Sequence, residues 1–163
     1  PDDQLMFFSE QKAFKLKEDI RLFADEGMSE ELLVIKARSV IDFGATYDVY
    51  DPTSGETLGA LRRRGIKSMF KDEWLILDTE DNEIGAVKED SVVMAMIRRT
   101  VGGIFPQKYI GEMDGEDVCT FKQNFNPFVQ KIRLDFSGDQ EGLLDRRIGI
   151  AAGVLLCAIE GRE

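Results

Sequence analysis

The stretch that decides the fold lies near the end of the chain, at residues 145–159, and reads DRRIGIAAGVLLCAI. Asp145 is a suitable helix N-cap, and the twelve residues from Ile148 to Ile159 carry no polar side chain. A strand of this length would be unusual, and the Ala and Leu content favours a helix. A helix that is apolar on every side must be surrounded by protein or lipid. Twelve residues rise only about 18 Å and a bilayer crossing needs roughly 20 residues, so we expect a central helix over residues 143–159, buried in protein.

Gly149 and Gly153 form a Gly-x-x-x-Gly pair within this stretch. In a longer apolar segment the pair would suggest dimerisation of membrane helices. Here we favour the alternative, in which small residues let strands approach a central helix closely. A Gly153→Leu substitution is then expected to overpack the interior.

The rest of the chain is a succession of short apolar or alternating runs cut by Gly, Asp, Asn and Pro, which is typical of an antiparallel β protein. One segment departs from this rhythm: residues 91–101 have helical spacing, with Ser91 as a plausible N-cap, and predict a short helix. We expect twelve strands, at Leu5–Phe8, Ala13–Leu16, Ile20–Phe23, Glu31–Arg38, Ala45–Tyr50, Thr57–Arg62, Ile66–Phe70, Trp74–Asp78, Glu83–Lys88, Lys108–Glu112, Val118–Gln123 and Ile132–Phe136.

A weak internal repeat supports hairpins. Residues 49–61 and 76–87 each contain a strand, an Asp-led turn and an apolar-Gly-Ala-apolar run, and residues 113–118 are a shorter version. Gly or Asn supplies the positive φ that a tight reversal needs. About twelve antiparallel strands followed by an apolar helix predict a closed β-barrel threaded by that helix, because closure buries the helix and removes the sheet edges. A single domain covering residues 1–163 is expected at this length.

The composition excludes several kinds of chemistry. The 163 residues include 21 Lys or Arg, 31 Asp or Glu and no His, giving a net charge of −10. Without His there is no Ser-His-Asp or Cys-His catalysis and no zinc site that uses His. The negative charge argues against nucleic acid as a partner. Since Gly-x-Gly-x-x-Gly, Walker-type and nucleophile-elbow motifs are also missing from the sequence, it favours a binding module over an enzyme.

The two cysteines, Cys119 and Cys157, lack the spacing of a metal site. A single disulfide between them is formally possible, but two thiols in a chain of this size more often indicate buried side chains in a reducing compartment. The first residues lack the basic and apolar regions of a secretion signal. These features predict a cytoplasmic protein without a transmembrane span, able to lie peripherally at a membrane.

Four stretches occur in a specific order along the chain: Trp74–Asp78, Phe105–Tyr109, the end strand Lys131–Phe136, and Asp145–Arg147 at the start of the Gly/Ala-rich helix. Over roughly residues 5–160 the chain resembles the superfamily that joins the tubby C-terminal domain, the phospholipid scramblases and the LURP-one-related proteins, with most likeness to the LURP-one branch. The resemblance implies a twelve-stranded barrel around a hydrophobic C-terminal helix. It also implies links to membranes, since tubby domains bind phosphoinositide head groups through basic side chains and scramblases respond to calcium.

A cluster of basic residues interrupts the acidic sequence. Residues 62–71 contain Arg62, Arg63, Arg64, Lys67 and Lys71. In a strand Arg62 and Arg64 point the same way, and a turn near residue 65 would bring Lys67 or Lys71 beside them as a patch for a phosphate-sized anion. The alternative is a solvated edge strand, which Lys and Arg commonly protect against aggregation.

The acidic linker before the last helix is a candidate calcium site. Asp135, Asp139, Glu141 and Asp145 could supply the several oxygen ligands that Ca²⁺ needs, and the linker occupies the position of the scramblase calcium segment. The spacing is not that of an EF-hand. Turn formation and helix capping explain Asp139 and Asp145 without a metal.

Three functions follow for testing. The first is a non-enzymatic domain that binds anionic phospholipid head groups through Arg62, Arg64, Lys67 and Lys71, with no cofactor other than the calcium just considered. The second is a protein-interaction or scaffold domain without lipid affinity. Lipid scrambling ranks third.

Overall fold

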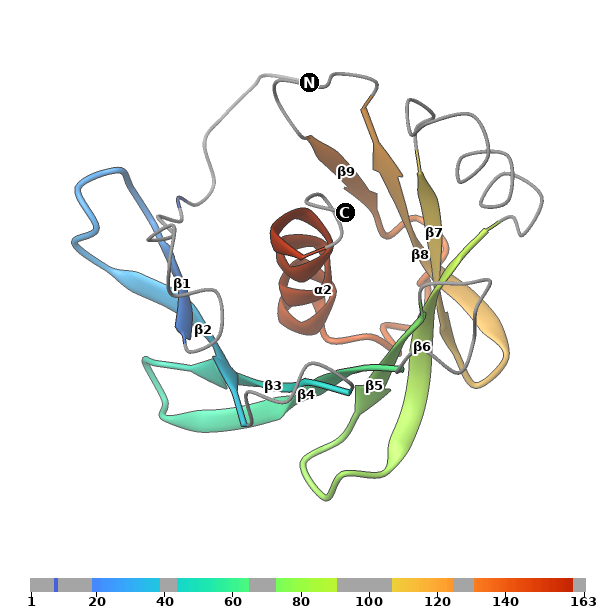
Figure 1. Ribbon diagram of the computed structural model, residues 1–163, viewed down its shortest axis with the longest axis horizontal. Coiled ribbons are helices and arrows are strands. Elements are labelled where there is room, and N and C mark those ends of the chain that lie inside the picture. Colours follow the sequence, from blue (N-terminus) through green and yellow to red (C-terminus); the bar gives the residue numbers. More distant parts are fainter. Residues whose placement is uncertain are drawn as a thin grey trace.

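Nine strands and one helix make up the described part of the chain (Figure 1). The computed structural model describes residue 8 and residues 19–38, 44–64, 73–90, 107–124 and 131–159. Helix α2 spans Arg146–Ala158. The strands are β1 (Asp19–Phe23), β2 (Glu31–Ala37), β3 (Thr46–Asp51), β4 (Glu56–Arg63), β5 (Glu73–Leu77), β6 (Glu83–Glu89), β7 (Lys108–Met113), β8 (Glu116–Gln123) and β9 (Ile132–Asp135).

These nine strands confirm nine of the twelve expected from the sequence. Of the other three, Ala13–Leu16 and Ile66–Phe70 lie outside the described residues, as does the helix expected over residues 91–101. From Leu5–Phe8 only Phe8 is described, and it forms an isolated antiparallel bridge with Phe23.

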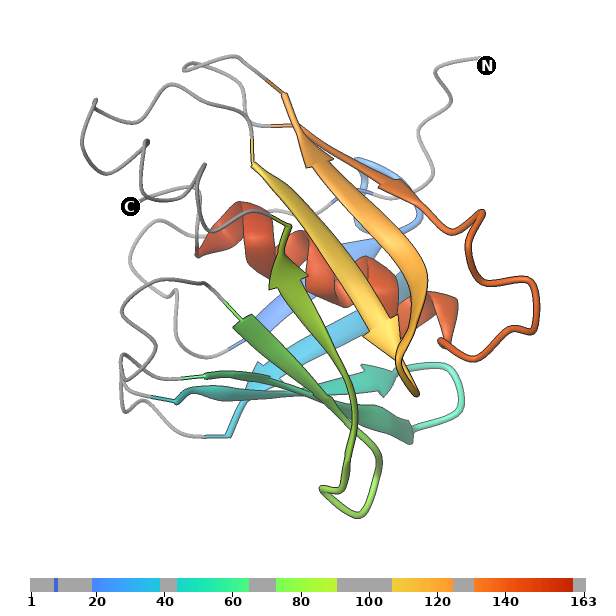
Figure 2. The same ribbon diagram turned by 90° about the vertical axis from the view of Figure 1, so that its right-hand side faces the viewer.

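All nine strands belong to one antiparallel sheet in which each strand pairs with its neighbours in the sequence, from β1 to β9. The sheet curls around α2, so that strands stand on several sides of the helix (Figures 1 and 2). Among the described strands, β1 and β9 are the two ends of this order and do not pair with each other. The fold is therefore mainly β, and the described strands do not complete the closed twelve-stranded barrel that the sequence predicts.

Register shifts in three hairpins account for the curvature of the sheet around α2 and for the glycine that recurs in each hairpin of the internal repeat. In β3–β4, β5–β6 and β7–β8 the register shifts beside Gly59, Gly85 and Gly111 respectively. A Cβ atom at Gly59 would lie 2.4 Å from the carbonyl oxygen of Leu77, so only glycine allows the neighbouring strand to come this close. Bulges increase the local twist of a sheet, and three of them in succession help it to wrap around α2.

The main core lies between the concave face of the sheet and α2. Trp74, Tyr109 and Phe121 are its largest fully buried side chains, and Trp74 packs against Tyr47 with ring centroids 5.9 Å apart. Helix α2 contacts β2, β4 and β9. Its buried residues are Ile148, Gly149, Ala151, Ala152, Leu155 and Leu156.

Burial of α2 is incomplete. Ile150, Val154 and Cys157 are half-buried and follow one another at helical spacing. Within the described structure, α2 is therefore buried against strands on several sides but is not fully enclosed, as the sequence predicts it to be. Within the described residues, no helix is long and apolar enough to cross a membrane.

A second, smaller core lies on the outer face of the sheet. Ala60, Leu75, Leu77 and Ala86, from β4, β5 and β6, form a separate buried cluster. Ala60 and Leu77 are 0% and 1% exposed, although they point away from α2. The polar side chains around this cluster include the candidate site.

Candidate functional site

Arg62 lies near the end of β4, on the same outer face as Ala60 because alternate residues of a strand share a face. Its neighbours in register are Thr46 on β3 and Leu75 on β5. The Arg62 Nε–H donates to the Thr46 hydroxyl at 3.2 Å. In the described structure no carboxylate lies within ion-pair distance of Arg62, so the outer edge of its guanidinium remains available to an anion.

Arg64 is held differently. Its backbone N–H donates to the Glu73 carbonyl at 2.9 Å, which continues the β4–β5 ladder by one residue. Its Nη1 lies 2.8 Å from Glu73 Oε2, and the hydrogen bond to Glu73 raises the pKa of Arg64. Lys67 and Lys71 lie outside the described residues. Of the four basic residues singled out in the sequence, Arg62 is thus a cation without a carboxylate partner and Arg64 is already paired.

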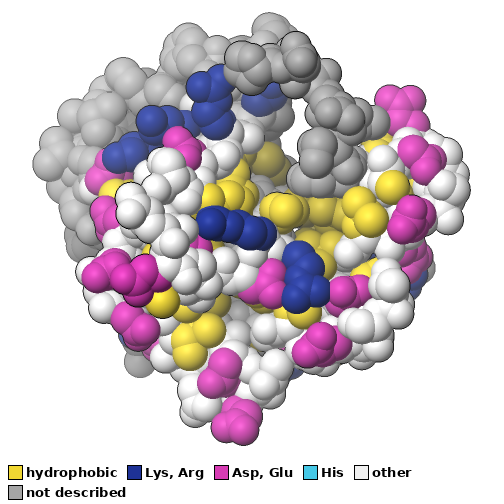
Figure 3. Space-filling view, turned by 180° about the vertical axis from the view of Figure 1, so that it is seen from behind, with side chains coloured by type: hydrophobic (Ala, Val, Ile, Leu, Met, Phe, Trp, Pro, Cys, Tyr) yellow, Lys and Arg dark blue, Asp and Glu magenta, His cyan; other side chains and the backbone are white. Residues whose placement is uncertain are grey.

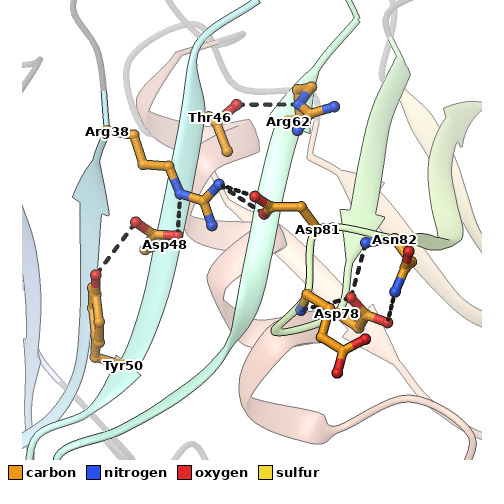
Figure 4. Close-up of polar contacts among 9 residues, drawn as sticks. Arg38, Thr46, Asp48, Tyr50, Arg62, Asp78, Asp81 and Asn82 are labelled. Carbon is orange, nitrogen blue, oxygen red and sulfur yellow. Dashed lines mark hydrogen bonds and ion pairs between the residues drawn. The ribbon is translucent and has the colours of Figure 1, made fainter.

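An arginine that the sequence patterns do not single out braces the same face. Arg38, which follows β2, places its Nε 2.6 Å from Asp48 Oδ1 and its Nη1 2.7 Å from Asp81 Oδ1 (Figure 4). Asp48 also accepts a hydrogen bond from the Tyr50 hydroxyl at 3.3 Å. Arg38 therefore links β3 to the β5–β6 turn, in which its partner Asp81 lies 43 residues further along the sequence.

The turn that presents Asp81 is built by Asp78. One carboxylate oxygen of Asp78 accepts the backbone N–H groups of Glu80 and Asn82, both at 2.9 Å, and the other accepts the Asn82 side-chain amide. These hydrogen bonds lower the pKa of Asp78, the Asn82 side chain contributing most. Asp81 has a φ of 67°, a conformation that short polar residues tolerate best. The acidic turn is therefore explained by its own backbone.

The acidic linker uses its carboxylates for structure. Asp139 has a fully buried side chain and accepts the backbone N–H groups of Leu143 and Leu144 at 2.7 and 3.2 Å. Asp135 accepts the N–H of Ser137 at 2.8 Å.

Asp145 caps α2 by accepting the N–H of Arg147, and Glu141 is exposed. The four candidate calcium ligands are all described, and among the described residues no three His, Cys, Asp or Glu side chains are placed to hold a metal ion. Backbone N–H groups already occupy oxygens of Asp135, Asp139 and Asp145, and calcium binding by these four residues stays a prediction.

The two arginines after Asp145 anchor the start of α2. Arg146 lies over the Phe136 ring, 4.4 Å from its centroid, and its Nη2 donates to the Asp139 carbonyl. Arg147 forms two ion pairs, at 2.7 Å with Asp145 and at 2.8 Å with Asp51 in the β3–β4 turn. The Asp-Arg-Arg sequence thus ties the helix to the linker and to a distant hairpin.

Neither cysteine is suited to nucleophilic chemistry. Both are free thiols, which confirms the preference for reduced cysteines. Burial raises the pKa of Cys119 to about 12 and also raises the pKa of Cys157. Because the thiolate is the reactive form, both thiols stay protonated and inert at neutral pH.

Comparison of the chain with models of protein families, with curated proteins and with solved structures finds no match.

Proposed function

We propose that this chain is a non-enzymatic, LURP-one-like binding domain that takes anionic phospholipid head groups at Arg62. The proposal includes the finer architecture, a closed twelve-stranded barrel of the tubby-like kind around α2. It is supported by the nine-stranded sheet that curls around a C-terminal helix and by the order of motifs in the sequence.

The observation that carries the binding proposal is the state of Arg62. The protein has 31 carboxylate side chains against 21 Lys and Arg, and the nearby Arg38 and Arg64 are both paired with carboxylates. Among the described residues, Arg62 instead keeps one side-chain hydrogen bond, from its Nε–H to the Thr46 hydroxyl. A guanidinium held from one side presents the fork that binds phosphate oxygens in pairs.

Thr46 has a positioning part in this proposal. Its hydroxyl accepts from Nε of Arg62, which fixes the plane of the guanidinium and leaves its terminal nitrogens for the ligand (Figure 4). Arg64 adds positive charge two residues further along the same face. Its ion pair with Glu73 is exposed on the arginine side, and such pairs are weak enough to rearrange around a phosphate.

The test is co-sedimentation with vesicles of phosphatidylcholine containing a fraction of an anionic phospholipid, at low and at high salt. Parent protein is expected to bind the anionic vesicles and to be released by salt. Arg62→Gln should weaken binding several-fold, whereas the matched variant Lys36→Gln, which also removes one positive charge from an exposed strand position, should bind like the parent. Arg62→Lys tests whether the charge alone is enough, because lysine keeps the positive charge but lacks the planar guanidinium that donates two parallel hydrogen bonds to a phosphate.

Two results would reject the proposal. If Arg62→Gln and an Arg62→Glu/Arg64→Glu double variant bind as the parent does, with unchanged circular dichroism, the site is elsewhere. If the parent fails to bind anionic vesicles even at low salt, the lipid function is rejected and the scaffold function is preferred.

A further inference from the structure

A second group of positive side chains lies on the opposite part of the sheet, where β7, β8 and β9 are adjacent. Lys108 on β7 is in register with Lys122 on β8, and Lys122 is in register with Arg133 on β9. Lys131 precedes β9 and continues its ladder, since the Asn124 N–H donates to the Lys131 carbonyl at 2.8 Å. Figure 3 shows Lys and Arg side chains gathered along this upper edge of the molecule.

The outward direction of these side chains follows from their neighbours. Tyr109 and Phe121 are buried in the main core, so Lys108 and Lys122, one position away along each strand, face outward. Ile132 and Leu134 also pack against the core, which places Lys131 and Arg133 on the outer face. Lys122, Lys131 and Arg133 are all exposed.

Three of the four cations form no ion pair with a carboxylate of the described residues. Asp135 on the same face still attracts Lys122 and Arg133, because the pKa of Asp135 is lowered first by its hydrogen bonds with Ser137 and then by these two cations. Lys108 is neutralised by Asp90 at 2.6 Å. In the part of the chain that the structure describes, no carboxylate lies within ion-pair distance of Lys122, Lys131 or Arg133. Like charges placed directly opposite each other on neighbouring strands destabilise a sheet, so the Lys122–Arg133 pair costs stability in a protein with 31 acidic residues.

The shape of the cationic area indicates its ligand. Lys131 and Arg133 are two residues apart along β9, a spacing of about 6.6 Å, and Lys122 stands beside Arg133 at the roughly 5 Å that separates adjacent strands. Carboxylates bound the area on two sides: Asp90 next to Lys108, and Asp135 beyond Arg133 on the same face. A broad anionic surface would meet both carboxylates, whereas the acidic part of an extended segment along β9 can end at Arg133, before it reaches Asp135.

We propose that Lys122, Lys131 and Arg133 form a docking surface for an acidic segment of a partner protein, lying extended along β9. Alternate side chains of an extended segment repeat every 6.6 Å or so, which matches the spacing from Lys131 to Arg133. Carboxylates at positions i and i+2 of the segment therefore meet both cations, and Lys122 reaches the one beside Arg133. This surface is separate from Arg62 and does not depend on the proposed lipid function.

The experiment measures binding of a fluorescent twelve-residue peptide in which Glu alternates with Ser, by anisotropy at low salt with the full chain. Arg133→Gln and Lys122→Gln should each weaken binding roughly fivefold, the effect of an exposed charge contact approaching 1 kcal/mol. Lys36→Gln is the control for loss of one charge, and Arg62→Gln is the control for the lipid site. Both controls should bind as the parent does.

A second peptide tests the spacing. It has the same composition but carries its Glu residues in adjacent pairs separated by pairs of Ser, so that no two Glu residues stand at positions i and i+2. It should bind more weakly, because only one of the two cations on β9 can then meet a carboxylate of the segment. Equal loss of binding in all four variants would show a general charge effect and overturn the proposal. If the peptide does not bind but anionic vesicles lose affinity on Arg133→Gln, the surface contacts membranes and the protein-partner proposal is also overturned.

Discussion

Substitution of the two glycines of α2 separates close packing from ordinary helix chemistry. A Cβ atom at Gly149 would lie 2.5 and 2.6 Å from Cε1 and Cζ of the Phe136 ring, closer than real carbon atoms come. At Gly153 the nearest atoms, in the Phe121 ring, are 3.7 and 3.8 Å away, which is normal contact. We therefore expect Gly149→Ala to destabilise the protein and Gly153→Ala to stabilise it.

The magnitudes follow from two opposing terms. Replacing a helix-interior glycine by alanine gains about 0.8–1 kcal/mol of helix propensity, and at Gly153 this gain stands nearly alone. At Gly149 the ring of Phe136 must move, and overpacking typically costs about 1–3 kcal/mol. The same movement disturbs the stacking of Arg146 on that ring, currently 4.4 Å from its centroid. The two variants should differ in free energy of unfolding by roughly 1–3 kcal/mol.

Urea denaturation followed by tryptophan fluorescence measures this difference, because Trp74 is the single tryptophan of the chain and is 2% exposed in the core. A Gly149→Ala variant as stable as Gly153→Ala would refute the packing argument. It would mean that Phe136, which is half-buried, moves aside without cost. The expectation from the sequence that Gly153→Leu overpacks the interior stays a prediction, because a leucine side chain adds far more volume than the single methyl group of alanine.

Two further predictions concern the linker and the helix start. Asp139→Ala should lower the free energy of unfolding by roughly 1–3 kcal/mol, measured in urea, because it leaves buried N–H groups without an acceptor; an unchanged stability would show that water replaces the carboxylate. The Arg147 hydrogen bond holds the pKa of Asp145 below its usual value, so this carboxylate stabilises the fold above about pH 4 and the contribution is lost as pH falls through the lowered pKa. Asp145→Asn should therefore flatten the acid limb of a stability–pH curve, and a parallel limb would contradict this assignment.

The strands could be predicted from sequence because their determinants are local. A period of two and the turn residues that interrupt it are readable within ten residues, and the nine described strands match those expectations. Helix α2 was readable for the same reason, since Asp145 caps it and twelve apolar residues follow. Closure of the sheet depends instead on which strands meet at its two ends, a relation between residues more than 100 positions apart that no local pattern encodes.

The candidate sites were harder to predict because charge patterns do not reveal partners. The five basic residues within 62–71 predict a joint patch for an anion, yet Arg64 is paired with Glu73. Arg38 lies outside any basic cluster, with only Lys36 close to it in the sequence, yet it forms two ion pairs, one of which joins residues 43 apart. The sequence shows the acidic linker as rich in oxygen ligands, but Asp139 and Asp145 already accept hydrogen bonds from backbone N–H groups. Asp145 is also paired with Arg147 and Asp139 with Arg146. The first N–H groups of a helix have no partner within the helix, so they compete with a metal ion for the oxygens of a nearby carboxylate.

The useful quantity in such a protein is the number of cations left without a carboxylate, not the number of cations. Water solvates an exposed Lys or Arg that has no carboxylate partner, so such a cation keeps its hydrogen-bond donors available to an anionic ligand. Arg62 stands apart from the other cations and is positioned by Thr46. This arrangement suits one compact anion that accepts two hydrogen bonds from the guanidinium. Lys122, Lys131 and Arg133 are spread along two strands, which suits an anion with repeating charges. The arrangement of these cations therefore argues for two sites with different ligands. Arg62→Gln should weaken binding to anionic vesicles and leave peptide binding unchanged. Arg133→Gln should weaken peptide binding and leave vesicle binding unchanged.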